Sequence, residues 1–176
     1  MNDFELIKLT LQHKYQYLKM INENGEDLKE TGFYYRVPLS TETSFEDDIK
    51  ILENRSKGIG LPEGKAPNST FFLFDRNYDK IVAAVNIRHK LDEYHSRHGG
   101  HIGYYVCQNE RNKGFAKIIL DKSLDICKQL GIDRVLLTCL KDNIASSRTI
   151  IAKGGVLEEE VEQNGEILQR YWITVK

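Results

Sequence analysis

The sequence predicts one α+β domain, with helices and strands mixed around a single sheet. Three observations predict this fold class: an ordinary globular composition, segments that alternate between strand and helix periodicity, and turn signals between neighbouring strands. The chain has 176 residues, of which 40% are hydrophobic and 29% are charged. A chain of this length can bury roughly 70% of its unfolded surface, which is enough for a core without metal or disulfide staples. We therefore treat residues 1–176 as a single domain.

The N-terminal part of the chain predicts a strand followed by a helix. Residues 4–9 have the pattern of a short strand, and apolar residues then recur at helical spacing from Leu11 to Leu18. We expect the pair Asn24-Gly25 to end this helix, because it favours a turn.

A second helix is predicted after a polar stretch, with Thr43 as its N-cap. Glu46 lies three residues further on, which completes a capping-box pattern. The apolar residues on one face of this helix are Phe45, Ile49 and Leu52. Residues 58–69 follow and are rich in Gly and Pro, so we predict a loop there.

The middle of the chain predicts a hairpin and then a strand and a long helix. Two apolar runs, at 70–74 and 81–87, flank residues 76–80, whose polar character is typical of a hairpin turn. Residues 101–106 predict a further strand. Residues 116–130 have the apolar stripe of an amphipathic helix.

The C-terminal part predicts three strands and one helix. Residues 135–140 form a nearly continuous apolar run, as expected of a strand covered on both faces, and we place it centrally in the sheet. A short helix over residues 144–153 ends at Gly154. The pair Asn164-Gly165 is a strong type I′ hairpin signal between the last two strands.

The charges balance overall but not locally. There are 25 Lys and Arg against 26 Asp and Glu, so the net charge of -1 gives no general affinity for nucleic acid or for an anionic membrane. Residues 22–53 hold nine acidic and three basic residues, a net of -6, whereas residues 111–153 hold nine basic and four acidic ones, a net of +5. An acidic approach would attract a cationic amine or polyamine-like substrate, although a solvated acidic helix is the alternative interpretation.

The cysteines and the N-terminus predict a soluble, cytoplasmic protein. Cys107, Cys127 and Cys139 are odd in number and widely spaced, as expected of reduced packing residues. The chain starts with no pattern of a signal peptide, and no stretch approaches the ~20 apolar residues of a membrane span.

A basic, glycine-containing loop at residues 107–116 lies between the strand 101–106 and the long helix. The first turn of a helix has backbone N–H groups without internal partners and the positive end of the helix dipole, so it binds anions. Gly114 allows the backbone to approach a ligand closely, and Arg111 and Lys113 add positive charge. The loop therefore suits a pyrophosphate, with an ordinary solvated loop as the alternative.

At these residues the sequence resembles the GNAT superfamily of acyl-CoA-dependent N-acetyltransferases. The family's acetyl-CoA motif, (R or Q)-x-x-G-x-(G or A), is present as Arg111-Asn112-Lys113-Gly114-Phe115-Ala116. It follows the strand residue Val106 by five positions. Further on, residues 135–140 look like the family's fifth strand, and Asn143 looks like its cofactor-contacting Asn.

The resemblance covers nearly the whole chain and is most specific over residues 81–155. It implies a three-layer α/β/α fold with a mixed, mostly antiparallel sheet of about seven strands and about four helices. It also implies a splay between the fourth and fifth strands.

The resemblance implies acetyl-CoA as the acyl donor and assigns the residues that bind it. The backbone of Tyr105, Val106 and Cys107 would hold the pantetheine arm like an added strand and polarise the thioester carbonyl. The amides from Arg111 to Ala116 would hold the pyrophosphate. Asn143 would hydrogen-bond the pantetheine end.

The implied reaction is direct attack of a neutral amine on the thioester, with backbone N–H groups stabilising the developing oxyanion. An alkylammonium has a pKa near ~10.4, so a base must first remove a proton, often through water. His101 is our catalytic candidate, because it aligns with a Glu that some members carry in the form E-I-G-Y. The alternative is a strand histidine hydrogen-bonded in or near the core.

Two further features bear on the chemistry. His89, His95, His98 and His101 lie within thirteen residues, but no HExxH motif or Cys pair accompanies them, so we predict no metal. Many family members have a Tyr seven residues after the Asn, where it can protonate the leaving thiolate, and here that position is Ile150. We name no general acid.

The acceptor is not identified by the sequence. The segments 32–38 and 61–68 lie where family members vary to shape the acceptor site. We predict acetyl transfer to a primary amine, with a small molecule as substrate. The alternatives are a protein N-terminal acetyltransferase and a non-catalytic acyl-CoA sensor or partner module, and the family leaves a homodimer possible.

Overall fold

The computed structural model describes residues 3–33, 36–38 and 44–175. Within them the strands are β1 (Phe4–Ile7), β2 (Asn68–Asp75), β3 (Lys80–Arg88), β4 (Ile102–Val106), β5 (Arg134–Leu140), β6 (Val156–Gln163) and β7 (Glu166–Thr174). The α-helices are α1 (Lys14–Glu30), α2 (Phe45–Ser56), α3 (Glu93–His98), α4 (Phe115–Gln129) and α5 (Ile144–Ala152). The number of strands is the predicted one, and the short helix α3 is additional to those expected.

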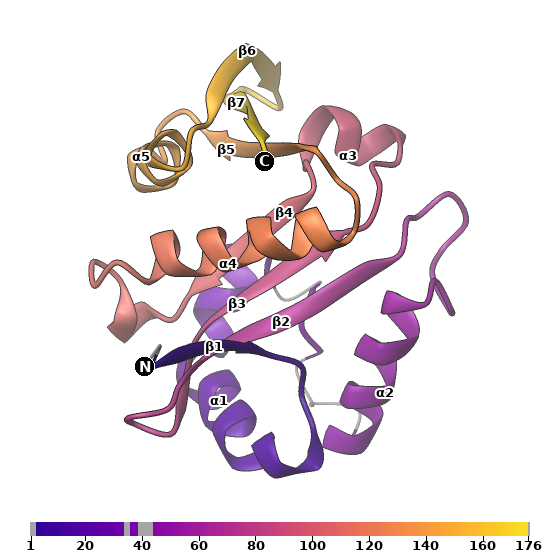
Figure 1. Cartoon of the computed structure of the whole chain (residues 1–176), viewed down its shortest axis with the longest axis vertical. Coiled ribbons are helices and arrows are strands. Elements are labelled where there is room, and N and C mark those ends of the chain that lie inside the picture. The colour runs from indigo at the N-terminus through magenta and orange to yellow at the C-terminus, as the bar shows by residue number, and fades with distance from the viewer. Residues whose placement is uncertain (1–2, 34–35, 39–43, 176) are drawn as a thin grey trace.

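The strands form two sheets rather than one (Figure 1). The first has the order β1-β2-β3-β4 and the second the order β5-β7-β6. Every strand pair in the described residues is antiparallel. The sheet is divided between β4 and β5, which is the place where the resemblance implies a splay.

Strand β5 lies at this division, which corrects the prediction that it is central in the sheet. It pairs along its length with β7, from Arg134 opposite Thr174 to Leu140 opposite Leu168. Its residues Val135 and Leu136 are nevertheless fully buried, because side chains of neighbouring elements cover both faces. The apolar run therefore indicates burial, not hydrogen bonding on both edges.

Helix α1 continues through Asn24-Gly25, where we expected it to end. Asn24 is buried, and its Nδ2 donates to the carbonyl of Met20 one turn earlier at 2.9 Å. Its Oδ1 accepts from the Tyr105 hydroxyl at 3.2 Å and from the backbone N–H of Gln108 at 2.9 Å. These distant partners replace the local bonds that make Asn favour turns.

Helix α2 begins one residue later than predicted. Its N-cap is Ser44, whose Oγ accepts from the backbone N–H of Asp47 at 3.2 Å. The capping box is thus formed by Ser44 and Asp47, and Thr43 lies outside the described residues. The predicted apolar face is confirmed, because Phe45 and Leu52 are buried.

Both predicted hairpins form. In the β2–β3 turn, Oδ1 of Asp75 accepts from the N–H of Asn77 at 3.0 Å, which is a typical Asx turn. In the β6–β7 turn, Asn164 and Gly165 have φ of 53° and 82°, as a type I′ turn requires.

The core has two hydrophobic clusters on opposite faces of the four-stranded sheet. One lies under α4 and extends to β5 and α5, with Ile119 and Ile150 fully buried in it. The other lies between the sheet and the helices α1 and α2, with Tyr17 and Phe72 fully buried. Figure 1 shows α4 on one face and α1 and α2 on the other, so the predicted three-layer arrangement is confirmed. In the described part of the chain, no helix is both long and apolar enough to cross a membrane.

Candidate active site

The loop before α4 presents a row of unpaired backbone amides. Asn112 and Gly114 have φ of 64° and 86°, and left-handed residues in such a loop turn successive N–H groups toward one side. Among the described residues, the N–H groups of residues 112–116 have no backbone acceptor, whereas that of Lys117 reaches the Gly114 carbonyl at 3.0 Å. The dipole of α4 points its positive end at the same place. The local structure is therefore an anion-binding loop.

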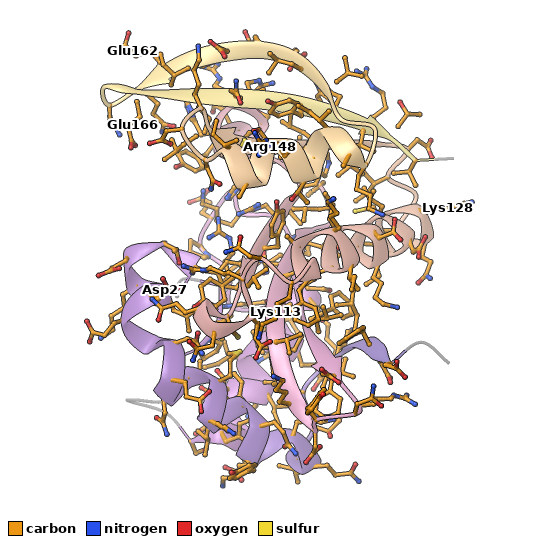
Figure 2. The ribbon with its side chains drawn as sticks, turned by 90° about the vertical axis from the view of Figure 1, so that its left-hand side faces the viewer. Asp27, Lys113, Lys128, Arg148, Glu162 and Glu166 are labelled. Carbon is orange, nitrogen blue, oxygen red and sulfur yellow. The ribbon has the colours of Figure 1, made fainter. Side chains whose placement is uncertain are left out.

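The basic side chains of this loop brace it instead of pointing freely into solvent. The guanidinium of Arg111 forms an ion pair with Asp27 on α1, and its Nε donates to the Val106 carbonyl at 3.2 Å. Lys113 Nζ lies 3.0 Å from Glu110 Oε2. Figure 2 shows Asp27 on α1 and Lys113 before α4. The loop therefore offers an anion mainly its main-chain amides.

The pKa of Asp27 reflects this bracing. Burial acts to raise it, but hydrogen bonds from Tyr105 and Arg111 outweigh burial and lower the pKa below its usual value. The carboxylate is therefore ionised at neutral pH and keeps Arg111 in place.

Strand β4 bonds to β3 through alternate residues. The N–H of Cys107 donates to the Val82 carbonyl at 3.0 Å, and the N–H of Arg88 donates to the His101 carbonyl at 2.8 Å. In an antiparallel pair, residues that bond to the partner alternate with residues that face away from it. The odd-numbered residues of β4 therefore bond to β3, and the even-numbered ones face the gap toward β5.

This alternation revises the predicted pantetheine contacts. The backbone groups of Tyr105 and Cys107 are directed at β3, so they are not available to an added strand. Of the three predicted residues, Val106 faces the gap, although its carbonyl already accepts from Arg111. Tyr104, which we did not predict, presents its N–H and C=O to the gap. The edge available to a ligand thus belongs to Tyr104 and the amide of Val106.

At the end of the gap near Gly100, hydrogen bonds join the start of β4 to β5. The N–H of His101 donates to the Leu136 carbonyl at 2.7 Å, and the N–H of Leu136 donates to His101 Nδ1 at 2.9 Å. Gly100 has φ of 63°, and a β-carbon added there would lie 2.4 Å from the Leu136 oxygen. The gap between β4 and β5 is therefore closed at Gly100 and open toward Val106.

The position of His101 does not support the predicted role as a base. The residue is buried, and it is not among the residues that line the cavity described below. Burial, together with the charge of Arg88, lowers the pKa of His101 to about 4. Its Nδ1 lone pair is occupied by the Leu136 amide, so Nε2 carries the proton of the neutral ring. These hydrogen bonds instead indicate a structural role for His101, which joins the start of β4 to β5.

A cavity of about 810 Å³ joins the anion-binding loop to the open gap. Its walls come from the end of α1, from β4, from the start of α4, and from β5 and α5. The predicted residues among its lining are Tyr105, Val106, Arg111, Asn112, Gly114, Phe115, Ala116 and Asn143. Cys107 and Lys113 are not among them.

The part of the cavity beside α5 carries the side chain of Asn143 and two hydroxyl groups, one from α5 and one that reaches across from β4. Asn143 caps α5, with its Oδ1 accepting from the N–H of Ser146 at 3.0 Å, so its amide NH₂ stays available for a ligand. The hydroxyl of Tyr104 lies 3.0 Å from Ser146 Oγ, and both residues line the cavity. Burial raises the pKa of Tyr104 above its usual value. The phenol therefore stays protonated and can donate.

The position that carries Tyr in many family members is filled by apolar packing here. Ile150 is fully buried and belongs to the cluster around α4, although it also borders the cavity. Ser146 lies one helical turn before it. The polar side chains in the part of the cavity beside α5 include Asn143, Ser146 and Thr149, and the Tyr104 hydroxyl reaches it from β4.

The described residues of the acidic segment 22–53 do not line the cavity with carboxylates. From this segment the lining residues are Thr31, Phe33 and Arg36. Of the segment's acidic residues, Asp27 is paired with Arg111, and Glu53 is paired with Lys57 on the surface. The structure thus gives no support to the cationic-substrate hypothesis. Of the two segments predicted to shape the acceptor site, 32–38 contributes and 61–68 does not.

The histidines have separate partners. His89 Nε2 lies 2.9 Å from Ser69 Oγ, and His95 Nδ1 lies 2.7 Å from Asp92 Oδ2. The described residues contain no group of three or more metal-ligating side chains. Cys107, Cys127 and Cys139 are all buried free thiols.

Comparisons with known proteins agree with this geometry. The profile of the acetyltransferase (GNAT) family matches residues 28–150. No curated protein matches the sequence. The fold is similar to the ribosomal-protein-S5-alanine acetyltransferase from Vibrio fischeri, at 15% identity and a TM-score of 0.68, covering 99% of this chain and 94% of that one.

Two further solved structures share the fold. One is the microcin C7 self-immunity acetyltransferase MccE in complex with acetyl-CoA and AMP, at 19% identity, a TM-score of 0.65 and coverage of 99% and 94%. The other is RimL, the ribosomal L7/L12 alpha-N-protein acetyltransferase in complex with coenzyme A, at 15% identity, a TM-score of 0.62 and coverage of 99% and 96%. With the family match over most of its length, the chain belongs to the GNAT family of acetyl-CoA-dependent acetyltransferases.

Proposed function

We propose that the protein transfers the acetyl group of acetyl-CoA to a primary amine by direct attack in the described cavity. The observation that carries this proposal is the run of unpaired amides at residues 112–116, which opens into the gap beside β4. A single cavity thus offers an anion-binding loop at one end and an unpaired strand edge next to it.

The residues present fit the donor. The amides of residues 112–116 would hold the pyrophosphate, since an oxyanion gains several hydrogen bonds there at once. The open backbone groups of Tyr104 and the amide of Val106 would pair with the pantetheine arm. The free NH₂ of Asn143 would donate to the amide end of that arm.

The acceptor enters as an ammonium and releases one proton to water before it attacks. When acetyl-CoA is bound, the neutral nitrogen would form the C–N bond as the C–S bond of the acetyl thioester breaks, and the second proton that the nitrogen loses is balanced by the proton taken up by the departing thiolate, giving the N-acetyl product and CoA thiol. The amide of Tyr104 or Val106 is placed to stabilise negative charge on the carbonyl oxygen. Tyr104 and Ser146 form the hydroxyl pair that donates a proton to the departing thiolate.

The cavity offers a weak base at most. Its acidic lining residue, among those the structure describes, is Glu110, which is bound by Lys80 at 2.6 Å and Lys113 at 3.0 Å. Burial opposes these contacts, but together they lower the pKa of Glu110 below its usual value. We therefore propose that water removes the proton and that amines of low pKa are favoured acceptors.

A small-molecule acceptor is our first candidate, and a protein N-terminus is the rival within the class. A non-catalytic acyl-CoA sensor is the alternative from another class, and the apolar Ile150 in place of the family's Tyr is the observation that favours it. These three candidate functions differ in what the protein does after it binds acetyl-CoA.

Two measurements on the intact protein test the proposal. Calorimetry measures acetyl-CoA binding, and a thiol-release assay is run with amines, amino acids, polyamines and peptides. We expect binding together with acceptor-dependent CoA release. Binding without release for every acceptor would favour the sensor, release with peptides alone would favour the N-terminal acetyltransferase, and no binding would refute the proposal.

The domain organisation, cellular location and oligomeric state of the protein are also proposals. We propose that residues 1–176 fold as one domain. The three free buried thiols support a cytoplasmic location. A homodimer is possible, and the mass in solution would test it.

A further inference from the structure

Arg36 places a positive charge in the cavity beside the open strand edge. A β-carbon added to Gly103 would lie 3.0 Å from Arg36 Nε and 3.4 Å from its Cζ. The guanidinium therefore packs directly against β4, and the absence of a side chain at Gly103 makes room for it. Gly103 precedes Tyr104, whose backbone faces the gap, and lies about 10 Å along the strand from Val106. The charge is thus next to the expected position of the thioester.

The protein leaves most of this guanidinium unbound. Nη1 donates to the Gly32 carbonyl at 3.3 Å, and Cζ lies 5.5 Å from the centre of the Phe33 ring. Nε is buried and has no hydrogen-bond partner. Among the described residues, no carboxylate forms an ion pair with Arg36. A half-buried guanidinium with a buried, unpaired N–H group and no counter-ion is unfavourable, so an anion that reaches it gains a favourable interaction.

Two other arginines of the chain have carboxylate partners. Arg170 is buried and bonds to Glu158 at 3.0 Å. Arg111 is paired with Asp27. Arg36 differs from both because its Nε is buried without a hydrogen-bond partner, it lines the cavity, and no carboxylate of the described residues pairs with it.

A second buried arginine on the same face strengthens the positive field. Arg88 bonds to carbonyl groups, with Nη1 donating to the Gly100 oxygen at 2.9 Å. Burial and the nearby charge of Arg36 lower the pKa of Arg88 to about 9, although Asp92 and Tyr94 act in the opposite direction. Asp92 itself bonds to His95 at 2.7 Å and lies 3.7 Å from Lys65. The excess charge at this end of the cavity is therefore positive.

From this geometry we infer that the acceptor amine also carries an acidic group, a carboxylate or a phosphate, which binds to the guanidinium of Arg36. The planar guanidinium fork matches both anions, and a neutral or polycationic amine would leave it without a partner. Because Arg36 packs beside Tyr104, the amine and the acid are separated by few bonds, as in an amino acid or an aminoalkyl phosphate. The inference rests on the proposed function, since it names the acceptor class of the same cavity.

The test compares matched acceptors in the thiol-release assay. Each amino acid is paired with its C-terminal amide, and 2-aminoethyl phosphate is paired with 2-aminoethanol, with spermidine as a polycation. We expect kcat/KM to be at least tenfold higher for the acidic member of one pair. The pair that shows the preference identifies a carboxylate or a phosphate as the recognised group.

Variants then assign the preference to Arg36. Arg36→Gln should lower kcat/KM at least tenfold for the acidic acceptor and leave the neutral partner and acetyl-CoA affinity unchanged, while Arg36→Lys should restore part of the loss. Arg76→Gln is the control with the same change of charge, because Arg76 is exposed and paired with Glu5 away from the cavity. Equal losses for both members of a pair would overturn the inference, as would neutral amines that react as well as acidic ones.

Calorimetry separates failure of this inference from failure of the proposed function. If no acceptor turns over, the same pairs are titrated into protein saturated with CoA. Binding of an acidic member that Arg36→Gln abolishes would keep the inference while transferase activity fails. Turnover of neutral amines alone would keep the function and refute the inference, and the lack of binding and turnover for every acidic member would also refute it.

Discussion

The two ends of the β4–β5 gap differ in whether the backbone N–H and C=O groups have hydrogen-bond partners. At the closed end, His101 and Leu136 exchange hydrogen bonds of 2.7 and 2.9 Å, and Gly100 lies against the Leu136 carbonyl. At the open end, the edge of β4 at Tyr104 and Val106 and the amides at residues 112–116 have no backbone partner among the residues that the structure describes. The same two strands are therefore joined like neighbours in a sheet at one end and separated at the other.

The difference shows which groups fold the protein and which groups it keeps for a ligand. Buried polar groups are normally paired, so a contiguous run of unpaired amides in a cavity indicates a binding surface. The closed end provides the rigidity that holds this surface open. Substitutions at the two ends should accordingly separate stability from function.

The largest effect is expected at the open end, from Gly114→Glu. The carboxylate would enter the anion-binding loop and repel the pyrophosphate, and the φ of 86° disfavours any side chain. We expect acetyl-CoA affinity to fall at least ~1,000-fold, about 4 kcal/mol, by calorimetry. Gly131→Glu is the matched control, because Gly131 has φ of 73° and open space at the far end of α4. Equal affinity in the two variants would remove the loop from the donor site.

The next largest effect is expected at the closed end, from Gly100→Ala. The added methyl group would lie 2.4 Å from the Leu136 oxygen and would force the strands apart. We expect the free energy of unfolding in urea to fall by about 2–4 kcal/mol. Gly64→Ala, with φ of 77° and nothing within 4 Å, should cost about 1 kcal/mol. Similar losses would show that the strands are not tightly joined at Gly100.

A smaller effect is expected from Tyr104→Phe in the wall of the cavity. Loss of the hydroxyl removes the proton donor paired with Ser146, but a thiolate leaves without much assistance, so kcat should fall about tenfold. Acetyl-CoA affinity should not change, because in the proposed site the backbone of Tyr104, not its hydroxyl, contacts the donor. Tyr171→Phe serves as the control, since its hydroxyl bonds to Gln169 outside the cavity. An unchanged kcat would exclude Tyr104 as the donor.

The smallest effect at neutral pH is expected from His101→Asn, which can keep an acceptor for the Leu136 amide and should cost about 1 kcal/mol. The pH dependence is more informative. The pKa of His101 is about 4 in the fold, against 6.5 for the unperturbed ring, so the unfolded state binds more protons between these values. Wild-type stability should therefore fall as pH drops from 6.5 toward 4, and less so in the variant.

Urea denaturation at pH 7 and pH 5 measures this difference. The acidic limb of the activity profile should be the same in both proteins, since the base lies elsewhere. A displaced acidic limb in His101→Asn would restore His101 as the base.

Most elements and the conformation of the loop before α4 were predictable because their signals are local. The capping pattern before α2, which we placed at Thr43 and which lies one residue later at Ser44, the Asn164-Gly165 turn and the glycine at position 114 each indicate a backbone conformation from a few neighbouring residues. The resemblance then identified the family, which the profile match confirms.

The errors concern contacts between distant residues. Asn24 stays helical because Tyr105 and Gln108 bond to it from more than eighty positions away. The sequence predicts that alternate residues of β4 face opposite edges, but not which set bonds to β3, so the open edge was assigned to Tyr105 and Cys107, whereas the structure leaves it at Tyr104. The pairing of Tyr104 with Ser146, 42 positions apart, has no local signal.

The role that we propose for Arg36 was predictable only in part. Its segment was predicted to shape the acceptor site, but the lack of a counter-ion emerges only when the surrounding side chains are placed. Charge counted along residues 22–53 suggested an acidic approach, whereas Arg36 is the charged residue that the described part of this segment contributes to the cavity.

The use of main-chain groups for the donor has a consequence for how such a protein diversifies. Backbone amide groups are present whatever the side chain, so substitutions within the anion-binding loop should leave CoA binding largely intact. In the acceptor site that we propose, acceptor choice depends instead on individual side chains such as Arg36. Descendants of this chain could therefore acquire new acceptors by few substitutions while inheriting the donor unchanged.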